Sequence, residues 1–239
     1  MQKSRTQIKS ESAPEKIIKQ IVKDIESGKL KPGDKLPNHQ EMANYYGVGR
    51  SSIREAINVL IVMDLIVAMQ GKGTFVKERT VKTEPVESGI YNIFKSASIY
   101  NLWEIREVLE CYSVRKAAEV ISEEQIVLLK EACERLAESY KKDHLYHLKE
   151  DNNFHMVIAQ AAKNPELGEI IKEIHSIVNK KMSIILKTSS TGNIKKAINT
   201  SKNIVGFIIS GDGSSAEREM REHLGIAKEA FIKSLLDEI

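Results

Sequence analysis

The chain has 239 residues, of which 41% are apolar and 29% are charged, and its formal net charge is +3. This length accommodates two domains of ordinary size, each with its own core. The longest apolar runs, such as residues 204–209, are too short to cross a bilayer, and residues 1–12 lack the apolar stretch of a secretory signal. Cys111 and Cys133 have no CxxC spacing, so they indicate a reducing compartment. We expect a cytoplasmic protein with no membrane partner.

Positive charge is concentrated at the start of the chain. Residues 1–77 contain 13 Lys and Arg against 8 Asp and Glu, which leaves 23 against 25 for residues 78–239. A basic excess on a small domain suits a polyanion partner, because neutralising phosphates releases condensed counterions. A solvated lysine face is the alternative explanation of the same charge.

The first elements along the chain are three helices and a hairpin. Apolar residues recur at helical spacing over 15–27, and the pattern stops at Gly28. Asn38 and Glu41 form a capping box that predicts a short helix to about Tyr46, and another helix follows over 49–60. Two β-rich runs, 65–69 and 74–76, flank a glycine-containing turn and predict a β-hairpin.

The remainder of the chain has a different pattern. Residues 78–89 lack a sustained period and predict a linker. Helical periods then cover about 100–120, 123–141, 144–162, 166–187, 193–209 and 214–236. Long helices joined by short turns pack as an antiparallel bundle. The sequence therefore predicts a mainly α protein, with a winged helix-turn-helix in residues 1–77, a linker in 78–89 and an all-α bundle in 90–239.

The helix over 49–60 has the two faces that a DNA-reading helix needs. Ile53, Ala56 and Leu60 share one side, while Arg50, Arg54 and Asn58 follow one another at i, i+4 on another. Ser51 and Ser52 lie in the first turn, where hydroxyl and backbone N–H groups can meet a phosphate. A surface helix whose arginines only keep it soluble is the alternative. The hairpin tip Gly71-Lys72-Gly73 favours DNA binding, because a narrow turn with one lysine fits a minor groove.

Four segments in order resemble the winged helix-turn-helix of the GntR family. They are Gly28-Lys29-Leu30-Lys31-Pro32-Gly33-Asp34-Lys35-Leu36-Pro37, Glu41-Met42-Ala43, Val48-Gly49-Arg50-Ser51-Ser52-Ile53-Arg54-Glu55-Ala56 and Gly71-Lys72-Gly73-Thr74-Phe75-Val76. The resemblance implies a sequence-specific transcriptional repressor in which Arg50, Arg54, Gly71 and Gly73 contact DNA. The family usually has Ser or Thr where Gly49 stands, and losing that hydroxyl cap costs only a few tenths of a kcal/mol. It usually has Arg where Gln40 stands, so the resemblance does not imply the base or phosphate contact of that arginine here. If each chain reads one half-site with its own wing, a homodimer on a palindromic operator is implied.

Polar residues interrupt the apolar stripes of two helices in the bundle. Asp151 and His155 share the stripe of Leu148, Ile158 and Ala162 at i+3 and i+4 steps. His223 likewise falls on the apolar side of the last helix. A carboxylate and two imidazoles can hold zinc, nickel or manganese. An Asp–His hydrogen bond and a satisfied core histidine would explain the pattern equally well.

Residues 100–236 resemble the FCD domain, the ligand-binding domain of the FadR-like branch of that family. The matching segments are Leu102-Trp103-Glu104-Ile105-Arg106-Glu107-Val108-Leu109-Glu110, Asp151-Asn152-Asn153-Phe154-His155, Asn164-Pro165, Gly211-Asp212 and Met220-Arg221-Glu222-His223-Leu224. The resemblance implies metal ligation by Asp151, His155 and His223, with the fourth position falling on Ser201. Serine is a poor zinc ligand. The resemblance therefore leaves two alternatives, a three-ligand metal site completed by water or an effector oxygen, and no metal at all. His175, one helix away, is the candidate to replace the missing fourth ligand. The alternative is an ordinary surface or core histidine.

Arg106 is the expected effector contact. The resemblance places this arginine toward the pocket, and a guanidinium binds a carboxylate through two parallel hydrogen bonds, which suits a small organic acid. Ser201 would complete the effector site. A surface pair between Arg106 and Glu110 is the alternative for the arginine. For the whole domain there are two alternatives. One is a metal-free pocket for an apolar or acyl ligand. The other is a metal-dependent enzyme, but the sequence offers no general base for it, and catalysis would leave the winged segment unexplained.

Overall fold

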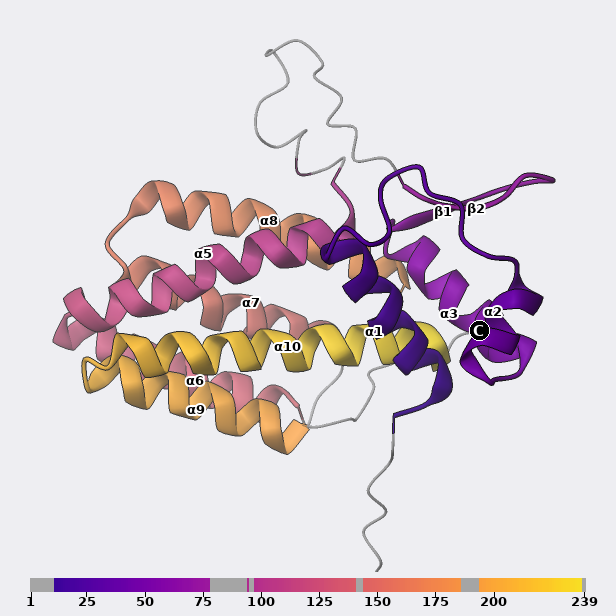
Figure 1. The fold of residues 1–239 in the computed structure, drawn as a ribbon. Coiled ribbons are helices and arrows are strands. Elements are labelled where there is room, and N and C mark those ends of the chain that lie inside the picture. The colour runs from indigo at the N-terminus through magenta and orange to yellow at the C-terminus, as the bar shows by residue number, and fades with distance from the viewer. Residues whose placement is uncertain (1–10, 78–93, 95–96, 141–143, 186–193, 238–239) are drawn as a thin grey trace, which may run out of the picture. The chain divides into compact units, whose positions relative to one another are not determined.

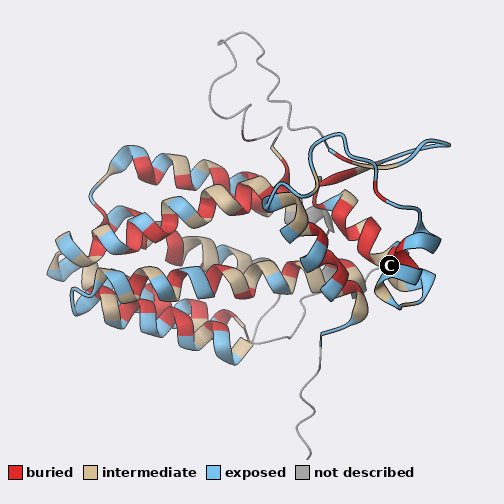
Figure 2. Cartoon of the chain, viewed as in Figure 1, coloured by how far each residue is buried: buried red, intermediate tan, exposed pale blue. Residues whose placement is uncertain are grey.

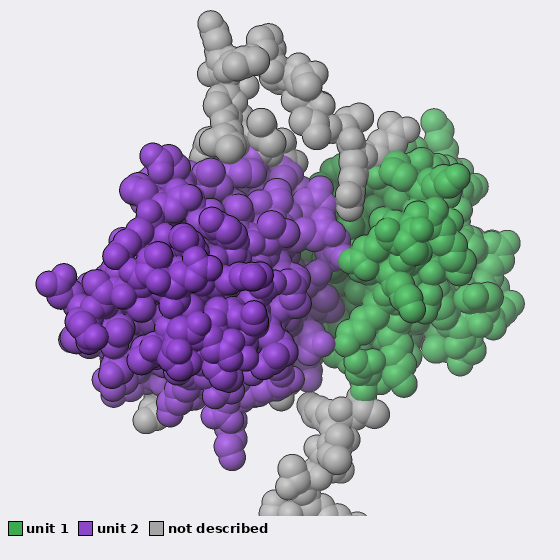
Figure 3. Space-filling view, turned by 60° about the vertical axis from the view of Figure 1, so that its left-hand side comes forward, with its two compact units in different colours: residues 1–80, 236–239 green, residues 81–235 purple. Residues whose placement is uncertain are grey.

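The computed structural model describes residues 11–77, 94, 97–140, 144–185 and 194–237 (Figure 1). The chain divides into two compact units, residues 1–80 with 236–239 and residues 81–235 (Figure 3). The linker predicted over 78–89 lies outside the described residues. Over these described ranges the architecture is mainly α, with one small antiparallel sheet, as the sequence predicts.

The described part of residues 1–80 contains three helices, α1 (Ala13–Glu26), α2 (His39–Tyr46) and α3 (Arg50–Val62). The predicted capping box starts α2. The Asn38 side chain accepts a hydrogen bond from the Glu41 backbone N–H, and the Glu41 carboxylate accepts one from the Asn38 backbone N–H. Gly47 ends α2 with a left-handed φ of 65°, which glycine adopts without strain. The apolar faces of α1 and α3 pack against each other and supply the buried residues Ile17, Ile18, Ile21, Ile53, Ala56 and Leu60.

The predicted hairpin follows α3. Strands β1 (Ile66–Met69) and β2 (Gly73–Val76) pair antiparallel, with Ile66 opposite Val76 and Met69 opposite Gly73. Lys35 makes an isolated antiparallel bridge to Phe75 on the other edge of β2. The segment before α2 is thereby tied to the hairpin, and the turn at residues 70–72 is left exposed at its tip.

Six helices make up the described part of the second unit, α5 (Ile99–Val120), α6 (Glu123–Ser139), α7 (His144–Ala161), α8 (Pro165–Ile185), α9 (Ile194–Ile209) and α10 (Gly213–Asp237). The predicted helices are confirmed, with ends within two residues of those expected. Helix α7 packs against α5, α6 and α8, while α9 packs against α5 and α6. Buried residues line the inward faces of these helices (Figure 2). The polar residues of α7 that face inward are therefore close to three other helices.

Both cysteines are buried free thiols, Cys111 on α5 and Cys133 on α6. Burial raises the pKa of the Cys111 thiol to about 12, so this thiol stays protonated and unreactive near neutral pH. Within the described ranges, no helix combines the length and the apolar character needed to cross a membrane.

Candidate functional sites

The N-terminal half of α3 presents polar side chains to solvent. Arg50, Ser51 and Arg54 are exposed, and Ser52 and Asn58 are partly exposed. Ile53, Ala56 and Leu60 on the opposite side are fully buried. The helix therefore has the two faces that its sequence predicts, with the arginine face available to a partner.

Gln40 links the two helices of the helix-turn-helix. Its side-chain oxygen accepts a hydrogen bond from Arg50 Nε, and its Nε2 donates to Asn44 Oδ1 over 2.9 Å. The resemblance did not imply a DNA contact where Gln40 replaces an arginine. In the structure this side chain orients the neighbouring Arg50, a role that no sequence pattern indicated.

The first turn of α3 has no side-chain cap. Gly49 is the N-cap residue, and no side chain accepts from the free backbone N–H groups at this end. Those N–H groups stand beside the exposed Ser51 hydroxyl and remain available to a phosphate, which helix N-termini favour. The departure from Ser or Thr at this position therefore leaves the anion-binding character of the helix start intact.

Both glycines of the hairpin tip have a positive φ that residues with a side chain rarely adopt. Gly71 has a φ of 72°, a conformation that side-chain-bearing residues adopt at a cost, although a Cβ there would meet open space. Gly73 has a φ of 117°, and a Cβ there would come within 2.7 Å of Lys35 Cε. Lys72 lies exposed between them. The tip is thus narrow and carries one cation, as the sequence predicts for a wing.

A cluster of polar side chains lies inside the bundle of the second unit. Arg106 and Glu110 come from α5, Asp151 and His155 from α7, His175 from α8 and His223 from α10. All except Asp151 are buried, and the Asp151 side chain is 19% exposed. Two overlapping sets within this cluster have ligand atoms close enough to hold a metal ion: Glu110, His155 and His175, and Asp151, His155 and His223.

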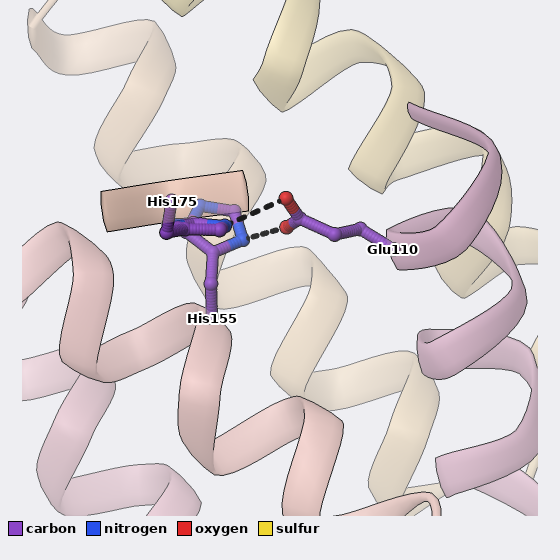
Figure 4. Close-up of side chains that lie close together, drawn as sticks. All are labelled: Glu110, His155 and His175. Atoms are coloured by element: carbon purple, nitrogen blue, oxygen red, sulfur yellow. Dashed lines mark hydrogen bonds and ion pairs between the residues drawn. The ribbon is translucent and has the colours of Figure 1, made fainter. Parts of the chain in front are cut away.

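Glu110 occupies the centre of the first set. Its Oε1 accepts from Arg106 Nε at 2.5 Å and from His175 Nε2 at 2.8 Å, and its Oε2 forms an ion pair with His155 Nδ1 (Figure 4). The alternative that Arg106 and Glu110 form a surface pair is wrong, because the two side chains are only 4% and 3% exposed. The pair forms as i, i+4 spacing allows, but it faces the core.

Asp151 faces both histidines of the second set. Its Oδ1 lies 3.7 Å from His155 Nε2 and 3.9 Å from His223 Nε2, which is too far for hydrogen bonds. His155 Nε2 is buried and has no hydrogen-bond partner among the described residues. Asp151 Oδ1 and the two imidazole nitrogens therefore lie close together without a hydrogen bond that joins them.

The charges of the cluster follow from its contacts. Burial by itself would raise the pKa of Glu110, but Arg106, His155 and His175 hold it well below its usual range. Burial likewise opposes the charge on His155, yet Glu110 raises the pKa of its imidazole to about 9. Burial and the nearby Arg106 lower the pKa of His175 to about 4. At neutral pH His155 is therefore charged in the metal-free protein, whereas His175 is neutral and donates its Nε2 hydrogen to Glu110.

Arg106 reaches from Glu110 toward Asp151. Its Nη2 lies 3.8 Å from Asp151 Oδ2, beyond hydrogen-bond distance, and its guanidinium carbon lies 5.1 Å from the centre of the Trp103 ring. A guanidinium fixed on one side by Glu110 and backed by an aromatic face is held in one orientation. The structure thus brings Arg106 to the same cluster as the predicted metal ligands.

Ser201 makes its contacts elsewhere. Its hydroxyl donates to the Ile198 carbonyl over 2.9 Å, and the Cys133 thiol lies 4.0 Å from its oxygen. The preceding Thr200 contacts His223 instead, with 3.0 Å between Thr200 Oγ1 and His223 Nδ1. Ser201 as an effector contact stays a prediction, and the contact with His223 adds Thr200 to the cluster.

Sequence reasoning missed Glu110 and His175 as members of the cluster. His175 was expected to be an ordinary histidine, and it is buried with its ring bonded to Glu110. A signal was present, because His175 stands beside Ile174 between Ile171 and Val178, all buried at helical spacing. The same stripe argument that selected Asp151, His155 and His223 would therefore have selected His175 as well.

A two-faced helix followed by a wing, joined to an all-α unit with a buried polar centre, is the arrangement of a DNA-binding regulator with a second, helical domain. Protein-family models agree with this class. Residues 14–76 match the bacterial regulatory proteins of the gntR family, and residues 101–225 match the FCD domain. The chain belongs to the GntR family, in the branch that carries an FCD domain. It is a transcriptional regulator and not an enzyme.

Individual relatives support the same assignment. The HTH-type transcriptional regulator LutR of Bacillus subtilis is 29% identical over 205 residues, which cover 84% of this chain and 92% of that protein. The HTH-type transcriptional repressor NanR of Klebsiella aerogenes is 30% identical over 154 residues, 63% of this chain and 59% of that protein. The solved structure of E. coli McbR/YncC shares the fold, with a TM-score of 0.52 at 16% identity over 94% of this chain and 99% of that one.

Proposed function

We propose that this regulator is a repressor that binds a palindromic operator as a homodimer and releases it under the control of a small carboxylate effector and a divalent metal ion. Residues 1–77 form the DNA-binding domain and residues 90–239 the effector domain. The similarity to a relative named as a repressor supports the direction of regulation. The exposed arginine face of α3 and the narrow, cationic wing support DNA binding.

The proposed DNA contacts divide by chemistry. Arg50 and Arg54 suit guanine O6 and N7 in the major groove, because an arginine fork matches that pair of acceptors. Ser51 and Ser52 suit a phosphate at the helix start, and Asn58 extends the same face. Gly71, Lys72 and Gly73 suit the minor groove. All eight side chains or backbone positions are exposed or partly exposed.

The position of Asp151 Oδ1 relative to two imidazole nitrogens carries the metal proposal. Ligand atoms that bind zinc at about 2.0–2.2 Å stand roughly 3.3–3.6 Å apart in a tetrahedron. The separations of 3.7 Å and 3.9 Å exceed those values by only a few tenths of an ångström. One carboxylate and two imidazoles fit zinc, nickel or manganese. The bound ion would supply positive charge toward the effector.

Arg106 supports a carboxylate as the effector. Its guanidinium lies beside the same carboxylate that would hold the metal, so an anionic ligand meets two cationic groups in one place. A metal-free pocket for an acyl chain fits this part of the bundle poorly, because an apolar ligand would bury charged groups without giving them partners. The cluster therefore favours an ionic ligand over an apolar one.

Native mass spectrometry and gel shifts test the proposal on the full chain. After treatment with a chelator, added Zn²⁺, Ni²⁺ or Mn²⁺ should bind at one ion per chain and raise the melting temperature. Asp151→Asn should abolish this binding, whereas Asp34→Asn, which alters an exposed carboxylate in the first unit, should leave it unchanged. A palindromic fragment from the neighbourhood of its own gene should be retarded, and small carboxylates should change its affinity.

The two halves of the proposal fail separately. Equal affinity for the palindromic fragment and for random duplex at fixed salt contradicts operator binding. If metal and chelator both leave the melting temperature and the operator affinity unchanged, the metal half is wrong.

A further inference from the structure

In both candidate histidine ligands the ring nitrogen Nδ1 faces a polar side chain, Thr200 for His223 and Glu110 for His155. His223 Nδ1 lies 3.0 Å from Thr200 Oγ1, and the Thr200 hydroxyl donates its one hydrogen to the Ala197 carbonyl at 2.9 Å. Thr200 can then only accept from the imidazole. His223 Nδ1 therefore carries a hydrogen, so Nε2, which lies 3.9 Å from Asp151 Oδ1, is the ring nitrogen that a metal ion can take.

The tautomer of His155 is fixed in the same way, by the carboxylate of Glu110. Its Nδ1 forms an ion pair with Glu110 Oε2 (Figure 4), and an ionised carboxylate has no hydrogen to give. Nδ1 must carry the hydrogen, so Nε2 is the nitrogen that a metal ion can take. Both histidines are thus set to offer Nε2, and both Nε2 atoms lie within 3.9 Å of Asp151 Oδ1.

Glu110 is itself prevented from turning away. Its Oε1 accepts from Arg106 Nε and His175 Nε2 at once, which fixes the plane of the carboxylate. The same contacts oppose direct metal binding by Glu110, His155 and His175. A divalent ion there would stand beside the guanidinium that already occupies Oε1, and like charges repel strongly inside a protein. Glu110 is therefore placed to orient the candidate ligand His155, and His175 is placed to hold Glu110.

We propose that Glu110 and Thr200 are positioning residues that hold His155 and His223 in the tautomer and orientation needed for metal binding through Nε2. This inference rests on the proposed metal site at Asp151, His155 and His223. Partners of this kind fix the orientation of ligating histidines and raise their basicity, and their loss typically lowers metal affinity about 10- to 100-fold. The charged partner Glu110 has the larger effect and the neutral Thr200 the smaller one.

The test measures Zn²⁺ affinity of the full chain by competition with a chelator. Glu110→Gln should weaken binding about 10- to 100-fold, and Thr200→Val about 10-fold. Thr200→Ser, which keeps the hydroxyl, should restore wild-type affinity. Glu107→Gln is the matched control, since this acid on the same helix pairs with Arg221 outside the cluster and should leave the affinity unchanged.

A second readout separates positioning from a general structural role. Long-range ¹H–¹⁵N spectra of the zinc-loaded protein should show hydrogens on Nδ1 of both histidines and metal on Nε2. Thr200→Val should lose the protected Nδ1 hydrogen of His223 and leave that of His155 in place. If Glu110→Gln does not fold, the Thr200 series and the double variant Arg106→Gln/Glu110→Gln, which removes both charges of the buried Arg106–Glu110 pair, provide the same comparison.

The outcomes distinguish the inference from the function on which it rests. Unchanged zinc affinity in both Glu110→Gln and Thr200→Val overturns the inference alone, provided that wild-type protein binds zinc. Binding that survives Asp151→Asn but not Glu110→Gln also overturns it, because Glu110 would then be a ligand. A wild-type chain that binds none of the three metals overturns the metal site together with the inference.

Discussion

The two polar regions of this regulator differ in burial, and that difference decides what a substitution in each can affect. Arg50 and Arg54 on α3 are exposed, and Arg50 has one side-chain partner within its own unit. Arg106, Glu110 and His155 are buried and share their partners. An exposed charge regains water when its partner is removed, whereas a buried one does not. Substitutions in α3 should therefore change DNA binding alone, and substitutions in the cluster should change stability as well.

The largest expected effect is from Arg106→Met in the metal-free protein. This change leaves the buried Glu110 without one of its two cationic partners, and breaking a buried pair costs about 3–5 kcal/mol. The double variant Arg106→Met/Glu110→Leu should recover most of that loss, because it removes both charges. Urea unfolding followed at Trp103 of α5, the single tryptophan of the chain, measures both. A double variant as unstable as the single one would contradict the assignment of a buried pair.

Arg54→Ala tests the exposed region. We expect a loss of about 1–3 kcal/mol in specific operator binding, with little change in non-specific binding. The melting temperature should stay nearly constant, since the side chain is exposed. Arg218→Ala on α10 is the matched control, because that arginine is also exposed and lies in the other unit. Equal losses on operator and random duplex would show that Arg54 contacts phosphate and not bases.

The pH dependence of metal affinity tests the charge state of His155. Its folded pKa is raised from 6.5 to about 9, so below that pH its Nε2 proton must leave when metal binds. Apparent Zn²⁺ affinity should therefore rise about tenfold, or about 1.4 kcal/mol, for each pH unit between roughly 7 and 9. Chelator competition at pH 7.0 and 8.0 gives the slope. A flat profile would show that His155 is neutral before metal binds.

The stability of the metal-free protein should change in the opposite direction over the same range. A raised folded pKa means that the stability gained from charged His155 is complete below pH 6.5 and is lost as the pH rises through about 9. His155→Gln should flatten this alkaline decline. Thermal unfolding with chelator present, compared between the two proteins from pH 6.5 to 9, measures the difference.

The smallest expected effect is from Gln40→Ala. The bond from Arg50 Nε to Gln40 Oε1 orients an exposed side chain, and such a bond is worth about 0.5–1.5 kcal/mol. Operator affinity should fall by that amount, and the fall should vanish when Arg50 is already Ala. Gel shifts of the two single variants and the double variant form the required cycle. Additive losses would show that Gln40 contacts DNA independently of Arg50.

Much of the fold could be predicted because local signals agree with the tertiary structure. The capping box of Asn38 and Glu41, the stop at Gly47 and the hairpin glycines each act within a few residues. The bundle helices begin and end close to the expected positions for the same reason. The site was predicted only in part. Asp151, His155 and His223 were found from their place on apolar stripes, but a stripe does not reveal which neighbouring helix supplies the partner.

The sequence by itself determined the two-faced helix α3, the wing and the inward direction of three bundle residues, since periodicity and turn chemistry are properties of short segments. Tertiary packing alone decided that Glu110 and His175 join His155, and that Thr200 and not Ser201 meets His223. These contacts join residues 20 or more positions apart, on different helices. Their geometry depends on how the helices cross and rotate against one another, which no local pattern specifies.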